Sequence, residues 1–280
     1  MANSFLGKIT KGFVGKAKAA LANPYKKIGV GWLDVRYLKN SSDTSLKTLK
    51  ILGGNLHYKN AFEVYHGLSE IFVDEIYKQQ LPENARVIDC GSHIGMSLIY
   101  LKQLCPTAKI TAFEPDAQNF KLLTDNMASF GYTKDVVLEN KAVWIENATL
   151  HFESSNDMSS HIVADNTKGA TISVQAVRLR DVINAKVDFL KIDIEGAEYE
   201  VMKDIEEKLH FVGNLFLEYH GNFNEGYKLN EMLQILERNQ FKYYIAEAVK
   251  VYKTPFSRSG TDAPAYDVQL NIHCFKTDHQ

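Results

Sequence analysis

Residues 86–95, Arg86-Val-Ile-Asp-Cys-Gly-Ser-His-Ile-Gly95, decide the fold of this chain. The apolar start predicts a buried strand, and the glycines predict a turn that leads into a helix. Because Gly91 and Gly95 carry no side chain, a ligand can approach the backbone at this turn. The stretch therefore predicts a strand–turn–helix unit with a ligand site at its turn.

A second apolar run, Ile110-Thr-Ala-Phe113, ends in Glu114-Pro115-Asp116. A carboxylate at the tip of the strand next to a glycine turn can accept hydrogen bonds from both hydroxyls of a ribose. The two segments together indicate a cofactor that contains a nucleoside.

The order of the glycines bears on which cofactor this is. A dinucleotide-binding turn reads G-x-G-x-x-G and holds a pyrophosphate, whereas here Asp89 precedes Gly91 and Gly95. A carboxylate at Asp89 would repel a pyrophosphate and could bind an ammonium group. S-adenosylmethionine (SAM) has an α-amino group and a ribose but no phosphate, so the turn favours SAM over NAD. An NAD(P)-dependent oxidoreductase and a plain strand–turn–helix with a capping Asp89 stay open as alternatives.

The composition is that of an ordinary globular protein. The chain has 280 residues, of which 45% are hydrophobic and 24% charged, which suits one large α/β domain with an N-terminal extension. No apolar run approaches the about 18 residues that a membrane-spanning helix needs. The three cysteines have no paired or metal-type spacing, which favours a reduced, cytoplasmic setting.

Basic residues are concentrated at the start of the chain. Residues 1–50 hold ten Lys or Arg and two acids, so the remaining 22 basic and 32 acidic residues leave a balance of −10. Residues 5–18 can form a basic amphipathic helix that rests on an anionic membrane, here the inner membrane surface. A helix packed on its own domain and a frayed terminus are the alternatives. We expect residues 1–60 to be a basic, partly helical extension and residues 61–280 to be the main domain.

Apolar runs and helical periodicities alternate through the rest of the chain. This alternation predicts a parallel sheet with helices on both faces. A strand over 171–177 is expected outside the main parallel set, after an irregular segment at 145–170. The expected strands are 87–90, 109–113, 136–143, 187–192, 215–219, 241–247 and 268–275, and the expected helices are 70–79, 95–104, 117–130, 197–208 and 229–239.

Ionisable side chains gather where these strands end, at the edge where ligands bind in open α/β sheets. The strand ends carry Asp89, Glu114, Ala142, Val143, Asp193, Glu195, Glu218 and His220. Asp193 and Glu195 project from one side of an extended chain, as do Glu218 and His220. A carboxylate beside an imidazole makes a workable general base for an alcohol. His220 could instead be a turn histidine bonded to the backbone, and Glu195 could accept N–H bonds at the start of the next helix.

Together these residues resemble the FkbM family of SAM-dependent methyltransferases, over about residues 86–220. The resemblance rests on Val87–Gly95, Phe113–Asp116, Asn140–Val143, Val187–Val201, which contains Lys-Ile-Asp-Ile-Glu-Gly-Ala-Glu, and Glu218-Tyr-His220. It implies a class I, Rossmann-like α/β fold with a seven-stranded, mostly parallel sheet, an antiparallel last strand and helices on both faces.

The resemblance also implies roles for individual residues. Asp89, Gly91, Ser92 and Gly95 would surround the methionine part of SAM, with His93 contributing its backbone. Glu114, followed by Pro115, would hold the ribose, Ala142 and Val143 would flank the adenine, and Asp193 would lie near the methyl group. The implied catalytic residues are His220, Asp193 and Glu218.

The implied reaction is in-line methyl transfer to a hydroxyl of a sugar, glycan or related natural product, with His220 or Asp193 as base. This scheme requires no metal. The acid-rich edge formed by these strand ends, which we call the rim, could nevertheless bind a divalent cation. Expected acceptor walls are 145–170, 221–226 and 254–264, with Phe256, Arg258 and Tyr266 as contacts. The acidic body, and the lack of Pro-Pro-aromatic after the fourth strand, disfavour nucleic acid. A non-catalytic SAM-binding or scaffold protein remains an alternative, and the oligomeric state stays open.

Overall fold

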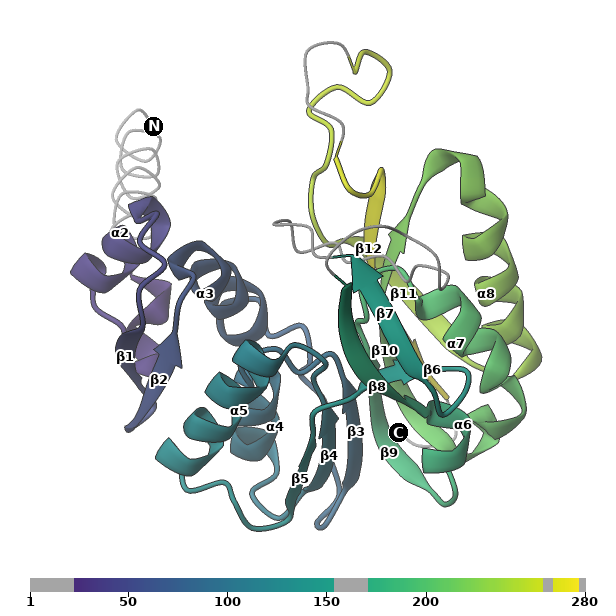
Figure 1. Ribbon diagram of the computed structural model, residues 1–280, viewed down its shortest axis with the longest axis horizontal. Coiled ribbons are helices and arrows are strands. Elements are labelled where there is room, and N and C mark those ends of the chain that lie inside the picture. The colour runs from purple at the N-terminus through teal and green to yellow at the C-terminus, as the bar shows by residue number, and fades with distance from the viewer. Residues whose placement is uncertain (1–22, 154–170, 259–263, 277–280) are drawn as a thin grey trace, which may run out of the picture. The chain divides into compact units, whose positions relative to one another are not determined.

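The computed structural model describes residues 23–153, 171–258 and 264–276 (Figure 1). The chain divides into two compact units, Met1–Ile76 and Tyr77–Gln280, and the expected boundary between residues 60 and 61 falls inside the first unit. The basic helix expected over residues 5–18 lies outside the described residues. Within the described ranges, no helix has the length and apolarity that crossing a membrane requires.

The first unit contains a β-hairpin that the sequence analysis did not anticipate. Its two strands pair antiparallel around Leu52-Gly53, and both turn residues have positive φ values, 49° and 83°. These values are typical of the type I′ turn, whose twist matches that of the strands it joins. The elements are η1 (Pro24–Ile28), α2 (Trp32–Asn40), β1 (Lys47–Ile51), β2 (Gly54–Tyr58), α3 (Ala61–Gly67) and η2 (Leu68–Val73).

The helix expected over residues 70–79 is wrong in kind and extent. The chain forms a short π-helical segment over Leu68–Val73. Glu75 then takes a left-handed φ of 55°, a conformation that a right-handed helix cannot contain. The apolar residues Ile71 and Phe72 are buried, which accounts for the helix-like spacing in the sequence.

A seven-stranded sheet forms the centre of the second unit. In spatial order its strands are β11 (Lys242–Glu247), β12 (Val268–Phe275), β10 (Val212–Gly221), β9 (Val187–Ile192), β3 (Arg86–Cys90), β4 (Lys109–Phe113) and β5 (Val136–Glu139). β5, β4, β3, β9 and β10 are parallel, and β12 is antiparallel to both of its neighbours. The arrangement confirms the expected α/β fold with a reversed last strand.

Helices cover both faces of this sheet, as expected (Figure 1). α4 (Met96–Leu104) and α5 (Ala117–Ser129) lie on one face, and α6 (Leu179–Val182), α7 (Glu198–Asp204) and α8 (Gly226–Arg238) lie on the other. The helix expected over 197–208 is shorter, because the chain tightens into the 3₁₀ helix η3 (Glu206–Phe211) after α7. A further 3₁₀ turn, η4 (Phe223–Glu225), precedes α8.

The strand expected over 136–143 is confirmed only for Val136–Glu139, because the chain leaves the main sheet at Asn140. The Asn140 amide donates hydrogen bonds to the backbone carbonyls of Glu114 and Pro115, at 2.8 and 3.0 Å. β6 (Ala142–Trp144) then joins a separate three-stranded sheet with β8 (Thr171–Arg178) and β7 (Thr149–Glu153). The strand expected near 171–177 does lie outside the parallel set.

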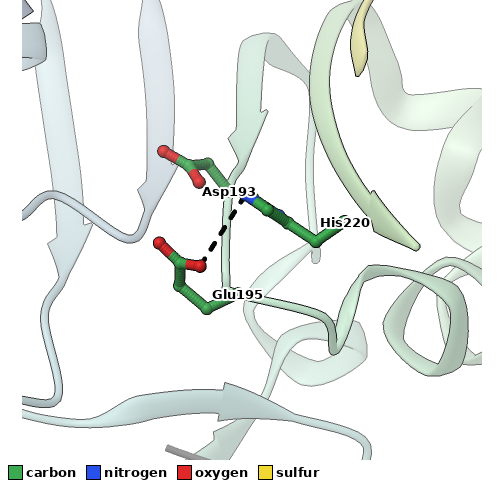
Figure 2. A group of neighbouring side chains, drawn as sticks. All are labelled: Asp193, Glu195 and His220. Carbon is green, nitrogen blue, oxygen red and sulfur yellow. Dashed lines mark ion pairs between the residues drawn. The ribbon is translucent and has the colours of Figure 1, made fainter. Parts of the chain in front are cut away.

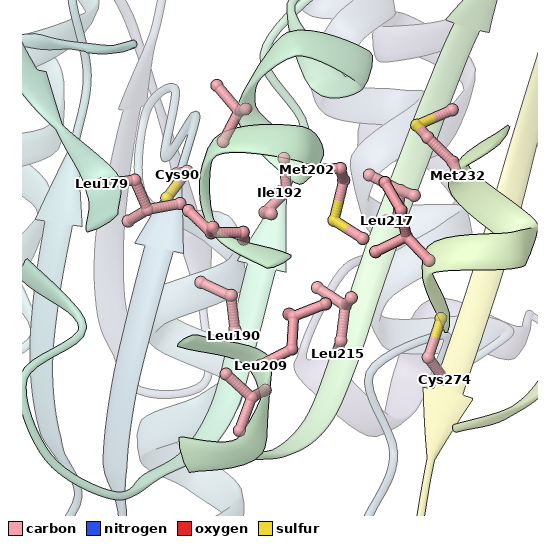
Figure 3. Packing of buried hydrophobic residues seen from close by; sticks show 14 of the residues in the cluster. Cys90, Leu179, Leu190, Ile192, Met202, Leu209, Leu215, Leu217, Met232 and Cys274 are labelled. Carbon is pink, nitrogen blue, oxygen red and sulfur yellow. The ribbon is translucent and has the colours of Figure 1, made fainter. Parts of the chain in front are cut away.

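The core of the second unit lies between the sheet and the helices α7 and α8, as Figure 3 shows. Leu190, Ile192, Leu215 and Leu217 come from neighbouring parallel strands, and all are completely buried or nearly so. Parallel strands that are covered on both faces read as continuous apolar runs, which is why β9 and β10 were evident in the sequence. This packing fixes the strands whose carboxyl ends carry the polar residues.

Candidate active site

The turn after β3 requires glycine at position 91. Gly91 has a φ of 85°, and a Cβ placed there would lie 1.7 Å from the backbone oxygen of Asp193. The N–H groups of Gly91 and Ser92 both donate to the carbonyl of Phe113 at the end of β4. The turn is therefore held against the ends of both neighbouring strands, β4 and β9.

Glu114 connects the end of β4 to this turn. Its Oε2 accepts the N–H of His93 at 2.8 Å, and its Oε1 accepts the N–H of Asp116 at 2.9 Å. His93 has a φ of 47°, so its backbone is turned towards the carboxylate. Burial raises the pKa of Glu114, although the N–H bonds from Asp116 and His93 oppose the rise.

Asp89 lies beneath the turn as part of a buried ionic group. Its Oδ2 accepts a hydrogen bond from Ser97 at 2.6 Å, whereas its Oδ1 is 3.6 Å from Nζ of Lys191 and has no hydrogen-bond partner among the residues that the structure describes. Lys191 donates to the Gly91 carbonyl at 2.8 Å and to Oδ2 of Asp193 at 3.0 Å. Burial raises the pKa of Asp89. Lys191 stays charged because the carboxylates of Asp193 and Asp89 raise its pKa despite burial.

Asp193 and Glu195 lie on the loop that follows β9. Glu195 has a left-handed φ of 54°, and the next residue, Gly196, has a φ of 95°. The Tyr266 hydroxyl donates to the Glu195 carbonyl at 2.6 Å and holds this loop. The side chains of Asp193 and Glu195 remain 24% and 52% exposed, so both carboxylates can meet a ligand.

His220, near the end of β10, is buried and held by Glu198. Its Nδ1 lies 3.1 Å from Oε1 of Glu198, and its side chain is only 4% exposed. Glu198 is itself completely buried and accepts the N–H groups of Ile194 and Gly196. The role that the sequence suggested for Glu195, accepting backbone N–H groups near a helix start, is filled by Glu198.

The other ring nitrogen of His220 faces carboxylates. Nε2 lies 3.7 Å from Oε2 of Glu195 and 3.7 Å from Oε1 of Glu218, beyond hydrogen-bond distance. Figure 2 shows Asp193, Glu195 and His220 converging from two strand ends. Burial lowers the pKa of His220, but Glu198, Glu195 and Asp193 outweigh it and raise that pKa to about 10. Both ring nitrogens of His220 are therefore protonated at neutral pH, and the ring is positively charged.

The structure brings most of the sequence-predicted site residues to one rim. Ser92 is buried and donates to the Asp89 carbonyl, and Gly95 starts α4 with a φ of 89°. Pro115 accepts from Asn140, and Ala142 and Val143 are buried in β6 just after that residue. Glu198 and Lys191 were missing from the prediction. Both lie inside the motif at 187–201, so only their roles were missed.

An aromatic group close to this rim combines Phe223 of η4, just after β10, with two residues of the chain between β11 and β12. The rings of Phe223 and Tyr252 stack with centroids 5.8 Å apart, and the Arg258 guanidinium lies 4.7 Å from the Phe223 ring centre. Asp267 accepts from the Tyr252 hydroxyl and from the N–H of Phe223. The N–H of Asp267 donates to the Gly221 carbonyl, one residue beyond His220. We call Phe223, Tyr252 and Arg258 the aromatic platform.

Comparison with known proteins identifies the family of this chain. The family model for the methyltransferase FkbM domain matches residues 89–243, more than half of the chain and nearly all of the rim. The chain belongs to the FkbM methyltransferase family. The resemblance to that family, noted from the motifs alone, is thereby confirmed. The comparisons therefore identify the chain as a member of a methyltransferase family.

Relatives of this FkbM-family chain include two fungal methyltransferases. Methyltransferase sdnD of Sordaria araneosa is 31% identical over an alignment of 175 residues, and the match covers 50% of this chain and 68% of the relative. Methyltransferase 1 of Beauveria bassiana is 27% identical over 164 residues, covering 50% of this chain and 66% of the relative. A solved structure, methyltransferase FkbM from Methylobacillus flagellatus, has 16% identity and a TM-score of 0.44, covering 76% of this chain and 54% of that one.

Proposed function

We propose that this protein is a SAM-dependent O-methyltransferase that methylates a hydroxyl of a sugar, glycan or related natural product. The observation that carries the proposal is the rim itself. A glycine turn braced by Glu114 stands at the ends of β3 and β4, and the Asp193–Glu195–His220 cluster stands at the ends of β9 and β10. In an open α/β sheet these adjacent strand ends form a single binding edge.

The residues at the glycine turn fit SAM better than a dinucleotide. Glu114 offers a carboxylate at the strand end next to the turn, where ribose hydroxyls can donate to it. The buried Oδ1 of Asp89 has no hydrogen-bond partner in the described part of the chain, and its charge favours a positively charged group above the turn. With Asp193 and Glu195 also nearby, the edge would repel a pyrophosphate.

When bound, SAM supplies a methyl group on a positively charged sulfur, which leaves with its bonding electron pair. The acceptor oxygen forms a bond to that carbon as the sulfur–carbon bond breaks, and the hydroxyl proton must pass to the protein. At neutral pH the imidazole of His220 already carries a proton, since its pKa is about 10. The proton acceptors in the cluster are therefore the carboxylates of Asp193 and Glu195, with His220 balancing their charge.

The aromatic platform supports an acceptor rich in hydroxyl groups. Phe223 is 47% exposed, and Phe256, in the chain between β11 and β12, is fully exposed. Aromatic rings pack on the apolar faces of sugars, and an arginine such as Arg258 donates hydrogen bonds to their oxygens. Because Asp267 joins the platform to Gly221, the acceptor would reach the cluster from this side.

A calorimetric titration with S-adenosylhomocysteine tests the cofactor assignment. We expect micromolar binding to the wild-type protein, a loss of affinity of about tenfold or more in Glu114→Gln, since a hydroxyl-to-carboxylate bond contributes about 1.5–3 kcal/mol, and no comparable binding of NADH. Glu139→Gln is the matched control, because Glu139 ends the neighbouring strand β5 and pairs with Lys141.

Turnover is then measured as S-adenosylhomocysteine released with a panel of sugar acceptors. Binding of S-adenosylhomocysteine without turnover on any hydroxyl acceptor would favour the non-catalytic scaffold alternative. Preferential binding of NADH would contradict the methyltransferase proposal altogether.

A further inference from the structure

We propose that Asp193, Glu195 and His220 bind a divalent transition-metal cation, such as Mn²⁺, at the rim. The metal site stands on the geometry of these three residues alone. A second step, in which the ion also takes the acceptor hydroxyl as a ligand, rests on the proposed methyltransferase function.

The spacing of the three side chains suits a single ion. One ligand atom from each of Asp193, Glu195 and His220 can be chosen so that all lie within 4.8 Å of one another. Donors that share one metal at about 2.0–2.2 Å lie about 3–4 Å apart when adjacent and up to about 4.4 Å apart when opposite. Side-chain shifts of up to about 1 Å therefore close the site, and the exposed Glu195 side chain can make them.

The ring of His220 is aimed at the gap in this cluster. Its side chain is only 4% exposed, and Oε1 of Glu198 holds its Nδ1 at 3.1 Å. Nε2 makes no hydrogen bond within the described residues and stands 3.7 Å from carboxylate oxygens of Glu195 and Glu218. A carboxylate behind a histidine is the usual support of a metal-binding imidazole, because it fixes the ring's orientation.

The loop after β9 is built to keep the two carboxylates in place. Glu195 is held in a left-handed conformation, φ 54°, which non-glycine residues adopt only when the surrounding structure holds them there. Tyr266 fixes its carbonyl, and the Glu198 carboxylate binds the N–H groups on either side of it, at Ile194 and Gly196. The backbone is thus constrained at the residue whose side chain faces His220.

The donor set indicates which metal fits. One imidazole nitrogen and two carboxylate oxygens match Mn²⁺, Fe²⁺ or Zn²⁺ better than Ca²⁺, which prefers oxygen alone. Lys191 occupies Oδ2 of Asp193 at 3.0 Å, so Oδ1 is the oxygen left for the ion. Three protein ligands leave coordination positions open, and the Nε2 proton leaves to solvent when the ion binds.

An ion here would change how the acceptor loses its proton. A hydroxyl bound to a divalent cation is more acidic and is held in a fixed position. The released proton then passes to Glu218 or to water, because Asp193 and Glu195 are engaged as ligands.

The test is direct metal binding to the full chain after treatment with EDTA. Mn²⁺ is titrated and followed by electron paramagnetic resonance of the free ion, with Zn²⁺ and Mg²⁺ as competitors. We expect one site per chain in the wild type and at least tenfold weaker binding in Asp193→Asn and in Glu195→Gln. Glu225→Gln is the matched control, since Glu225 is an acid near the same rim that pairs with Lys228; its affinity should stay within twofold.

The outcomes separate this inference from the proposed function. No stoichiometric Mn²⁺ site in the wild type, or equal weakening by Glu225→Gln, overturns the metal site. S-adenosylhomocysteine titrated into the EDTA-treated protein reports on the cofactor site independently, and its retention in Glu195→Gln shows that the rim is folded in that variant. Methyl transfer that is lost with EDTA and restored by Mn²⁺ supports the second step, whereas full activity in EDTA rejects it.

Discussion

At the scale of single residues, His220 is defined by the carboxylate that holds it. Glu218 lies two residues away in the sequence, but Glu198, 22 residues away, makes the hydrogen bond to Nδ1. Because Glu198 is wholly buried, its negative charge acts on the ring without screening by water. The ring is therefore an imidazolium at neutral pH, and its proton adds to the stability of the fold.

The pH dependence of stability follows from this residue. The pKa of His220 rises from an ordinary 6.5 in the unfolded chain to about 10 in the folded one. Its contribution is therefore fully present below pH 6.5 and is lost as the pH rises through 10. Since each pKa unit corresponds to about 1.4 kcal/mol, we expect a loss on the order of a few kcal/mol between pH 6.5 and 10.5.

Urea unfolding in metal-free buffer at several pH values measures this effect. The comparison is between the wild type and His220→Gln, because the glutamine amide can still bond to Glu198 but does not titrate. The difference in unfolding free energy between the two proteins should shrink steadily from about pH 6.5 to pH 10 and then level off. A difference that is constant from pH 6 to pH 10.5 would contradict the raised pKa.

At the scale of elements, the turn between β3 and α4 links three strand ends. Gly91 approaches the Asp193 backbone after β9, and the N–H groups of Gly91 and Ser92 bond to Phe113 at the end of β4. Lys191 adds a further bond to the Gly91 carbonyl. A change at this turn should therefore disturb the cofactor side and the catalytic side of the rim together.

Gly91→Ala tests this coupling. The new Cβ would lie 1.7 Å from the Asp193 oxygen in a left-handed conformation, so we expect a loss of at least about 3 kcal/mol in stability. S-adenosylhomocysteine binding should fall with it. Gly131→Ala is the matched control, since Gly131 also has a positive φ, 72°, but has open space around its Cβ position.

The control should lose only the about 1–2 kcal/mol that a left-handed L-residue costs. Thermal unfolding and calorimetric titration of the two variants give both quantities. Equal destabilisation of the two variants would show that the close approach of Gly91 to Asp193 does not add to the loss of stability in Gly91→Ala.

At the scale of the whole molecule, charge is separated along the chain. Residues 1–22 contain Lys8, Lys11, Lys16 and Lys18 and no acid, whereas the chain after residue 50 has a balance of −10. We propose that the first 22 residues bind anionic membranes and bring the protein to a membrane-borne acceptor. Each lysine near an anionic surface contributes about 1 kcal/mol.

Sedimentation with liposomes measures this binding. The full chain should bind anionic liposomes and not neutral ones, and a chain lacking residues 1–22 should lose most of that binding. Added salt should weaken the binding of the full chain, because salt screens exposed charges. Equal sedimentation of the two chains would remove the membrane role.

The α/β fold, the glycine turn and the strand-end acids could all be predicted from the amino-acid sequence. These features are local, because buried parallel strands read as apolar runs and a positive-φ turn requires glycine. Local reasoning was wrong where a side chain redirected the backbone, as when Asn140 binds the carbonyls after β4 and sends the chain out of the sheet. The pattern of apolar residues over 136–143 does not predict that contact.

Only the tertiary structure decided which charges meet. Glu198 reaches His220 because α7 packs beside β10, and Lys191 lies between Asp89 and Asp193 because β9 pairs with β3 in one register. Both partners were visible in the motif at 187–201, but distance along the chain gives no measure of distance across a sheet. The electrostatics of the rim depends on those distances and on burial, and both are set by how strands and helices pack.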